Sequence, residues 1–147
     1  MAIAAAANDT LIWAFNTILY GDASTMNSNS RGGDDTLISG TGTDHMWGDA
    51  QFINGVAASP TAPTGAVVTG ADTFVFSPGN GADFIHDFRQ SDHDRIDVSA
   101  YGFDDLGDMT ITGTGTDTVI AFDVNNSVTL AGLIDPSVLQ ASDFLFA

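Results

Sequence analysis

The stretch GGDDTLISGTGTDHMWGDA, residues 32–50, decides the fold class of this protein. It places glycine and aspartate around three apolar positions, Leu37, Met46 and Trp47. Glycine reaches backbone conformations that other residues avoid, and aspartate favours turns. Each glycine-aspartate cluster therefore predicts a turn of about six residues, and the apolar residues between clusters predict strands of about three residues.

The same pattern recurs elsewhere in the chain. Residues 8–23 read NDTLIWAFNTILYGDA, and residues 34–50 read DDTLISGTGTDHMWGDA, so both end with an aromatic residue followed by Gly-Asp-Ala. A looser third copy, ADTFVFSPGNGADFIHD, spans residues 71–87. A single half-repeat cannot bury its apolar residue alone, so this repetition predicts stacked coils with two turns each.

Two segments interrupt the repeat. Residues 24–31 and 51–69 are rich in serine, glycine, proline and small residues, so they predict loops that leave the side of the stack. We expect an all-β chain in which residues 1–87 form a parallel β-roll carrying these two loops.

The remaining residues, 88–147, lack the repeat and predict a β-rich cap on the roll, since a solenoid needs an atypical end. Residues 94–103, 109–122 and 126–133 combine apolar runs with turn signals, so they predict short strands and hairpins. Residues 135–147 predict a short helical turn followed by a last strand.

The composition restricts the possible partners. All 19 acidic residues are aspartate, the only basic residues apart from histidine are three arginines, and the net charge is −16. The absence of a basic patch argues against binding to nucleic acid. The chain has no cysteine, which excludes disulfides and thiolate metal sites, and no apolar run approaches the ~20 residues of a transmembrane helix.

Aspartate carboxylates and glycine carbonyls in tight turns form the hard oxygen environment that Ca²⁺ prefers. Alternate half-repeats lie on the same side of a stack, so we expect one column at Asp9, Asp35 and Asp72 and another at Thr17, Asp44 and Asp83. We expect Asp22 and Asp49 to contribute mainly carbonyl oxygens. The full set of candidate calcium ligands is Asp9, Asp22, Gly32, Gly33, Asp35, Gly40, Gly42, Asp44, Asp49, Asp72, Asp83 and Asp97.

Residues 39–47, SGTGTDHMW, match the nonapeptide G-G-x-G-x-D-x-U-x at every defined position except the first. On this motif the chain resembles the RTX family, the haemolysin-type calcium-binding proteins that bacteria export. The resemblance implies a parallel β-roll with Ca²⁺ bound in its turns, which folds when the chain meets calcium outside the cell.

Residues 71–103 and 127–147 resemble the carboxy-terminal domain that follows the repeats in serralysin-type exported proteins. That resemblance implies a secreted protein, a carboxy-terminal secretion signal and the type I secretion machinery as a partner.

Enzymatic activity is not expected of this chain. It has no glutamate, so it cannot contain H-E-x-x-H, and it has no G-x-S-x-G. His45, His86 and His93 are not grouped at a metal-ligand spacing in the sequence. Two alternatives stay open: an adhesion, carbohydrate-binding or ice-binding module, suggested by the alternating threonines of residues 110–118, and an accessory tail of a secreted metalloprotease.

Overall fold

A computed structural model describes residues 2–3 and 7–147 of the chain. Strands and 3₁₀ turns make up its regular structure, and no α-helix occurs within the described residues. Accordingly, that part of the chain has no helix long and apolar enough to cross a membrane. The structure confirms the all-β class.

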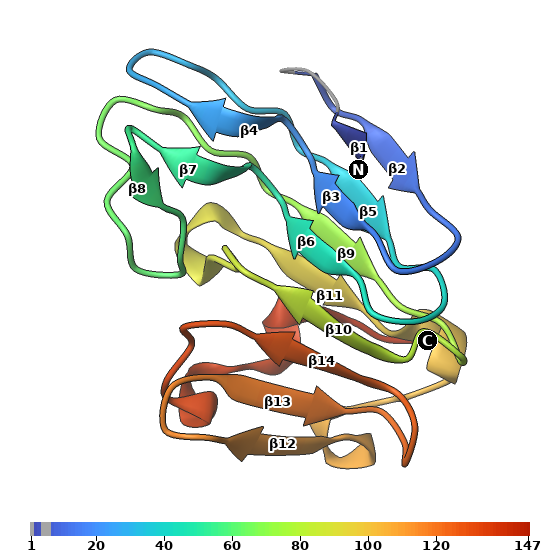
Figure 1. The fold of residues 1–147 in the computed structure, drawn as a ribbon. Coiled ribbons are helices and arrows are strands. Elements are labelled where there is room, and N and C mark those ends of the chain that lie inside the picture. The colour runs from blue at the N-terminus through green and yellow to red at the C-terminus, as the bar shows by residue number, and fades with distance from the viewer. Residues whose placement is uncertain (1, 4–6) are drawn as a thin grey trace.

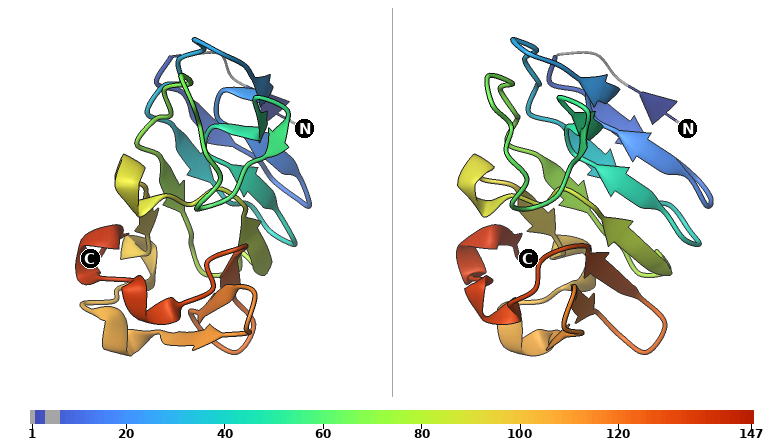
Figure 2. Two further views of the ribbon diagram at one scale, coloured as in Figure 1. Left: turned by 90° about the vertical axis from the view of Figure 1, so that its left-hand side faces the viewer. Right: turned by 60° about the vertical axis from the view of Figure 1, so that its left-hand side comes forward.

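Two sheets face each other across a common core (Figures 1 and 2). Sheet A contains, in spatial order, β1 (Ala2–Ile3), β3 (Ile18–Tyr20), β6 (His45–Trp47), β10 (Ala82–Ile85), β14 (Ser127–Leu130), β13 (Thr118–Ala121) and β12 (Thr110–Gly113). Sheet B contains β15 (Phe144–Leu145), β11 (Arg95–Asp97), β9 (Thr73–Val75), β5 (Thr36–Ile38) and β2 (Thr10–Ile12). The pairs are parallel except at β14–β13–β12, so the chain winds as a parallel β-roll.

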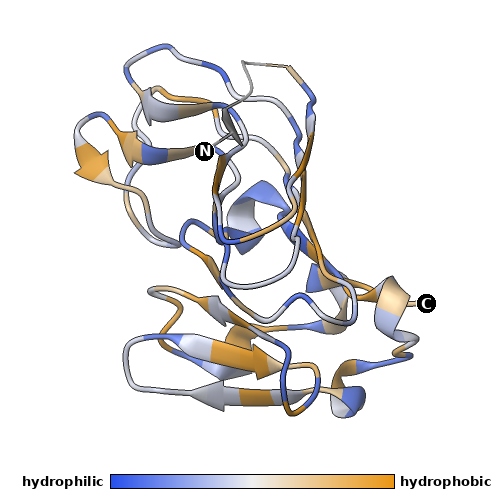
Figure 3. Cartoon of the chain, turned by 45° about the vertical axis from the view of Figure 1, so that its right-hand side comes forward, coloured by the Kyte–Doolittle hydropathy of each residue, from blue (hydrophilic) through white to orange (hydrophobic). Residues whose placement is uncertain are grey.

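The repeat sets the register of the coils. Leu11, Leu37 and Phe74 are paired across β2, β5 and β9, and all three are buried. Successive side chains of a strand point to opposite faces, so the central residue of each three-residue strand points into the roll. In Figure 3 the hydrophobic colour lies mainly along the strands, and much of the blue lies in the turns.

Residues 88–147 continue both sheets of the roll. β11 and β15 extend sheet B, β14 extends sheet A in parallel, and one apolar cluster runs from Leu11 to Phe144. The predicted hairpin appears as β12–β13. The predicted carboxy-terminal turn and strand appear as 3₁₀ turns at Pro136–Val138 and Ala141–Asp143 followed by β15.

The prediction of loops for the two inserted segments was wrong in part. They contribute to a third sheet of β4 (Ala23–Met26), β7 (Ala50–Ile53) and β8 (Val56–Ala57), in which β4 and β7 are parallel. This sheet has its own apolar cluster, which includes Met26, Trp47, Ile53 and Val67. The inserts fold because they lie beside one another and together bury residues that neither could bury alone.

The alternating threonines of residues 110–118 do not form one continuous row. The chain reverses between β12 and β13, where Thr114 hydrogen-bonds to Asp117 in the turn. Thr118 is buried, and its hydroxyl donates to the Leu133 carbonyl at 2.7 Å. The five threonines are therefore divided between two strands and the turn that joins them, rather than aligned along one strand.

Candidate metal centre

The turns of the roll form two opposite edges. The turns at residues 13–17, 39–44 and 76–81 lead from sheet B to sheet A, and we call them the short-turn edge. The turns at residues 21–35, 48–72 and 86–94 lead from sheet A to sheet B, and we call them the long-turn edge. Both inserted segments leave from the long-turn edge.

Four aspartates form a column along the long-turn edge. The backbone N–H of Asp9 donates to Asp35 Oδ1 at 2.8 Å, and that of Asp35 donates to Asp72 Oδ1 at 2.8 Å. The N–H of Asp72 continues the ladder to Asp94 Oδ1 at 2.9 Å. Each carboxylate thus fixes the start of the equivalent strand in the preceding coil.

A second group of aspartates faces this column from the ends of the sheet A strands. Asp22 Oδ1 accepts from the N–H of Gly33 at 3.0 Å, and Asp49 Oδ1 accepts from that of Gly70 at 2.8 Å. Both side chains are buried, with 4% and 1% of their surface exposed. The expectation that they contribute mainly carbonyl oxygens was therefore incomplete, because their carboxylates also point into the edge.

Three carboxylate oxygens on the long-turn edge have no hydrogen-bond partner among the described residues. They are Oδ2 of Asp22, Asp35 and Asp72, and each is buried. Leaving a charged oxygen buried and unpaired is costly unless a cation balances it. These three oxygens are the strongest sign in the structure of a missing positive ligand.

These carboxylate oxygens approach the backbone of glycine residues closely, because a glycine has no Cβ atom. A Cβ atom on Gly48 would lie 2.1 Å from Asp72 Oδ2, and one on Gly21 would lie 2.3 Å from Asp35 Oδ2. The Cβ atom added to Gly21 would also lie 1.8 Å from the carbonyl oxygen of Gly48. Carboxylate or carbonyl oxygen therefore lies directly beside each glycine, and a side chain there would collide with it.

Burial shifts the acid-base behaviour of these aspartates. Burial, with the nearby charges of Asp94 and Asp49, raises the pKa of Asp72 to about 10. Burial, with the charge of Asp87, raises the pKa of Asp49 to about 8. Burial also raises the pKa of Asp22, Asp35 and Asp87, each to about 6. Without a bound cation, the edge holds protons that ordinary aspartates would release.

Arg89 supplies a positive charge in the last coil of this edge, where its Nε lies 3.9 Å from Asp92 Oδ2. Arg89 is buried, and its backbone N–H donates to Asp94 Oδ2 at 2.7 Å. The Arg89 charge acts to lower the pKa of Asp87, although the effect of burial is larger. The coils that begin with Asp9, Asp35 and Asp72 rely on backbone donors instead.

The short-turn edge carries a similar column. The N–H of Thr17 donates to Asp44 Oδ1 at 2.7 Å, and that of Asp44 donates to Asp83 Oδ1 at 2.8 Å. Asp44 and Asp83 are buried, with at most 1% of their surface exposed. The backbone ladder thus repeats the geometry of the long-turn edge.

The second oxygens of this column differ from those of the long-turn edge because they have protein partners. Asp44 Oδ2 accepts from the N–H of Gly40 at 3.0 Å. Asp83 Oδ2 accepts from the Ser39 hydroxyl at 2.7 Å and from the Asn80 amide at 2.8 Å. The carboxylates of the short-turn edge are therefore satisfied by the chain itself.

Most of the candidate residues fall on one edge or the other. The long-turn edge contains Asp9, Asp22, Gly32, Gly33, Asp35, Asp49 and Asp72, and the short-turn edge contains Gly40, Gly42, Asp44 and Asp83. Asp97 joins neither column: it lies at the far end of β11, where its Oδ1 accepts from the N–H of Ser99 at 2.9 Å. The structure does not support Asp97 as part of the set.

Two members of the long-turn edge, Asp87 and Asp94, were absent from the candidate set. Asp87 accepts from the N–H groups of Gly48 at 2.8 Å and Asp49 at 3.1 Å. Asp94 had a signal in the sequence, because Asp-Arg-Ile at 94–96 pairs in register with Asp-Thr-Phe at 72–74. It is a fourth copy of the strand motif, shifted by three residues from Asp97.

The donor set fits a hard cation that accepts mixed oxygen ligands. Within residues 2–3 and 7–147, no three aspartate or histidine side chains converge closely enough to enclose a metal by themselves. The unpaired oxygens instead lie close to glycine backbone, and beside Gly21 the carbonyl oxygen of Gly48 approaches as well. Asp22, Asp35 and Asp72 could hold a Ca²⁺ ion only together with such carbonyls, and Ca²⁺ accepts this combination.

Comparison with known proteins finds similarity among solved structures. No protein-family model matches the chain, and no curated protein matches it. The chain is similar to the solution structure of the AlgE6R3 subunit from the Azotobacter vinelandii mannuronan C5-epimerase, with 26% identity and a TM-score of 0.50 over 99% of this chain and 81% of that one. This similarity supports an RTX-like β-roll fold but not the more specific resemblance to serralysin-type proteins.

Proposed function

We propose that this chain is a calcium-binding β-roll module, with Ca²⁺ held at the long-turn edge. The observation that carries the proposal is the set of three buried, unpaired carboxylate oxygens of Asp22, Asp35 and Asp72, which lie close against glycine backbone. Bound Ca²⁺ would supply positive charge where burial now raises the pKa of each carboxyl. The RTX-like fold agrees with this function.

Calcium binding would act as a folding switch. The chain has a net charge of −16, and it repels itself when its carboxylates are ionised and unbalanced. Cytosolic Ca²⁺ is scarce, so the chain would stay open inside the cell, and Ca²⁺ outside would convert binding free energy into folding free energy.

Export by a type I system before folding is part of this proposal. The proposed carboxy-terminal signal includes Phe144, which is buried in the folded structure where β15 pairs with β11. A signal placed there is accessible only while the chain is open. The folding switch and the secreted location therefore support each other.

We propose no catalytic activity for this chain. Its strongly shifted carboxyls, such as Asp49 and Asp72, are buried in the turns and hydrogen-bonded to backbone N–H groups. The similar AlgE6R3 chain is named as a subunit of an epimerase. An accessory role beside a catalytic domain is part of the proposal, and this likeness is consistent with it.

Calorimetric titration with Ca²⁺ tests the site. Asp72→Asn removes a charge from the long-turn edge and is expected to weaken calcium binding by about tenfold or more, because ligand charge sets Ca²⁺ affinity. Asp83→Asn is the matched control: it changes an equally buried aspartate on the short-turn edge and is expected to change the affinity by less than about twofold. Equal affinities for the wild type and Asp72→Asn would refute the placement of the site.

A further inference from the structure

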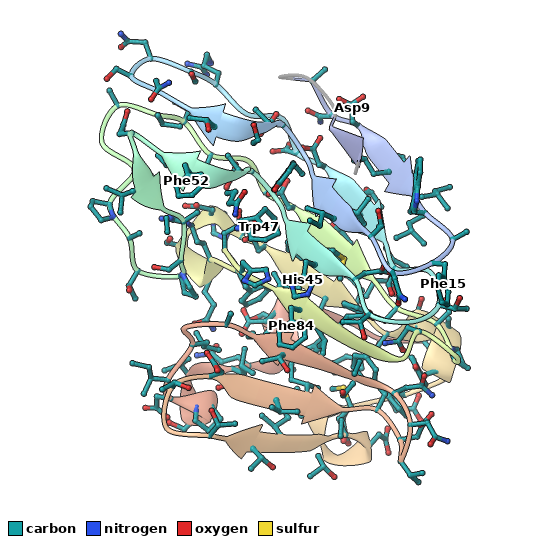
Figure 4. The ribbon with its side chains drawn as sticks, in the orientation of Figure 1. Asp9, Phe15, His45, Trp47, Phe52 and Phe84 are labelled. Carbon is teal, nitrogen blue, oxygen red and sulfur yellow. The ribbon has the colours of Figure 1, made fainter. Side chains whose placement is uncertain are left out.

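The outer face of sheet A carries a row of rings that lies apart from both aspartate columns. The row runs through Tyr20, Trp47, His86, His45 and Phe84. The Trp47 and His86 rings are parallel, with centroids 4.0 Å apart, and the His45 and Phe84 rings have centroids 4.8 Å apart. Figure 4 shows His45 on β6 between the labelled side chains of Trp47 and Phe84.

Two histidines meet at the centre of this row. Nδ1 of His45 lies 2.9 Å from Nε2 of His86, although the residues are 41 positions apart in the sequence. Parallel pairing of β6 with β10 places Phe84 beside His45, so His86 is its diagonal neighbour. The two histidines are therefore brought together by strand pairing, although they are not grouped in the sequence.

The surroundings of the pair suit a metal ligand. Both rings are half-buried and are held by their aromatic neighbours, so little side-chain freedom remains to be lost on binding. Burial lowers the pKa of His86 to about 4, which keeps its ring neutral at neutral pH. The Asp117 carboxylate acts on His86 in the opposite direction, because its negative charge favours a positive charge there.

We propose that His45 and His86 form a two-histidine site for a divalent transition-metal ion of the Cu²⁺ and Zn²⁺ class. Imidazole nitrogen suits these ions, whereas Ca²⁺ prefers oxygen. With metal–nitrogen bonds of about 2.0–2.1 Å, two imidazole nitrogens at a tetrahedral angle lie about 3.3 Å apart. A tetrahedral ion therefore requires the rings to tilt and to separate by a few tenths of an ångström, whereas neighbouring positions of a square-planar Cu²⁺ lie about 2.9 Å apart and require only the tilt.

The proton balance of binding is simple. In the metal-free pair, one ring donates its N–H to the lone pair of the other. When the metal binds, the donating ring moves that proton to its other nitrogen, so both facing nitrogens become ligands. Neither ring changes its charge, and solvent water completes the coordination of the ion.

Quenching of Trp47 fluorescence by Cu²⁺ tests the site directly. The measurement uses the full chain with Trp13→Phe, so that Trp47 is the only tryptophan, and millimolar Ca²⁺ occupies the oxygen sites. Since Trp47 stacks on His86, Cu²⁺ bound to the pair is expected to quench its emission strongly. His45→Asn and His86→Gln, which lose the ligating nitrogen, are each expected to raise the half-quenching Cu²⁺ concentration about tenfold or more.

His93→Gln is the matched control, because His93 is the third and last histidine of the chain and is exposed. Its quenching curve is expected to coincide with that of the parent. Absence of quenching, the same curve for all variants, or equal weakening by His93→Gln would each overturn the proposal.

Paramagnetic resonance of the Cu²⁺-loaded parent provides a second measurement that needs no histidine variant. Hyperfine splitting of the Cu²⁺ signal by two imidazole nitrogens would support the site, even if a histidine variant fails to fold. One imidazole nitrogen, or none, overturns it.

Discussion

The two turn edges of the roll have nearly the same backbone geometry but treat their carboxylates differently. On both edges, an aspartate Oδ1 accepts the N–H of the equivalent residue in the preceding coil, as Asp72 does from Asp35 and Asp83 does from Asp44. On the short-turn edge the second oxygen of Asp83 accepts from side chains. On the long-turn edge the second oxygen of Asp72 has no partner among the described residues.

This difference shows that the number of aspartates does not by itself define a cation site. What matters is whether nearby donors already satisfy the carboxylate. Ser39 and Asn80 provide such donors on the short-turn edge. On the long-turn edge the second oxygens of Asp35 and Asp72 lie close against Gly21 and Gly48, which have no side chain to donate. The best nonapeptide match, residues 39–47, thus provides one of the donors, Ser39, that satisfy the Asp83 carboxylate.

Removal of calcium is expected to have the largest effect on this comparison. A ligand at a hundredfold excess over its Kd stabilises the folded state by about 2.7 kcal/mol, so chelation is expected to speed amide exchange about a hundredfold per occupied site. The amides of Asp35 and Asp72 should lose more protection than those of Thr17 and Asp44. Hydrogen exchange in EDTA and in millimolar Ca²⁺ measures this. Equal amide protection in EDTA and in Ca²⁺ would refute the folding switch. Equal losses of protection on the two edges would show that calcium does not act on the long-turn edge in particular.

The pH dependence of stability without calcium is expected to be the next largest effect. The folded pKa values of Asp72 (about 10) and Asp49 (about 8) lie above the unfolded value of about 3.9. Their contribution to stability is therefore complete below about pH 4 and is lost as the pH rises through the folded values, by at most about 1.4 kcal/mol per pH unit for each proton.

Thermal unfolding followed by circular dichroism checks this sign. In EDTA the Tm is expected to fall between pH 5 and pH 8, and in saturating Ca²⁺ this fall should largely vanish because the bound carboxylates stay ionised. Asp72→Asn should make the fall shallower in EDTA. A Tm that rises with pH in EDTA would contradict the assignment.

Adding a side chain at Gly48 should show a further difference between the long-turn edge and the rest of the fold. Gly48→Ala places a Cβ atom 2.1 Å from Asp72 Oδ2, so we expect a loss of stability of about 1–3 kcal/mol and a marked loss of calcium affinity. Gly113→Ala is the control, since its Cβ would meet only Pro136 ring atoms at 3.1 and 3.2 Å and the Ile134 carbonyl oxygen at 3.7 Å. Denaturant unfolding and calorimetry would measure both. Equal effects of the two substitutions would show that the close approach of Asp72 Oδ2 to Gly48 has no special role.

The smallest expected effect concerns Asp97, which lies outside both columns. Asp97→Asn keeps an oxygen that can accept from the N–H of Ser99, so we expect a stability change below about 1 kcal/mol and an unchanged calcium affinity. The same calorimetric titration serves as the measurement. A loss of affinity comparable with that of Asp72→Asn would mean that the long-turn edge does not define the site.

Much of the fold follows from local patterns in the sequence. Asp-Thr-Leu-Ile at 9–12 and 35–38 and Asp-Thr-Phe-Val at 72–75 predict strands in register, and the structure pairs them that way. The inserted segments were harder to predict, because β4 and β7 stabilise each other across two separate stretches of chain. Neither stretch has a repeat that would show this pairing.

Some features of the candidate site likewise follow from the sequence, and others appear only in the tertiary structure. The sequence alone determined the coils, the inward-facing residues and the placing of Asp35 and Asp72 in one column, because a repeat fixes which residues are equivalent in successive coils. Only the tertiary structure decided which carboxylate oxygens stay unpaired and that His45 meets His86. Hydrogen-bond donors can come from distant parts of the chain, as Ser39 does for Asp83 across 44 residues. Such contacts depend on how the coils stack, and no local sequence pattern specifies them.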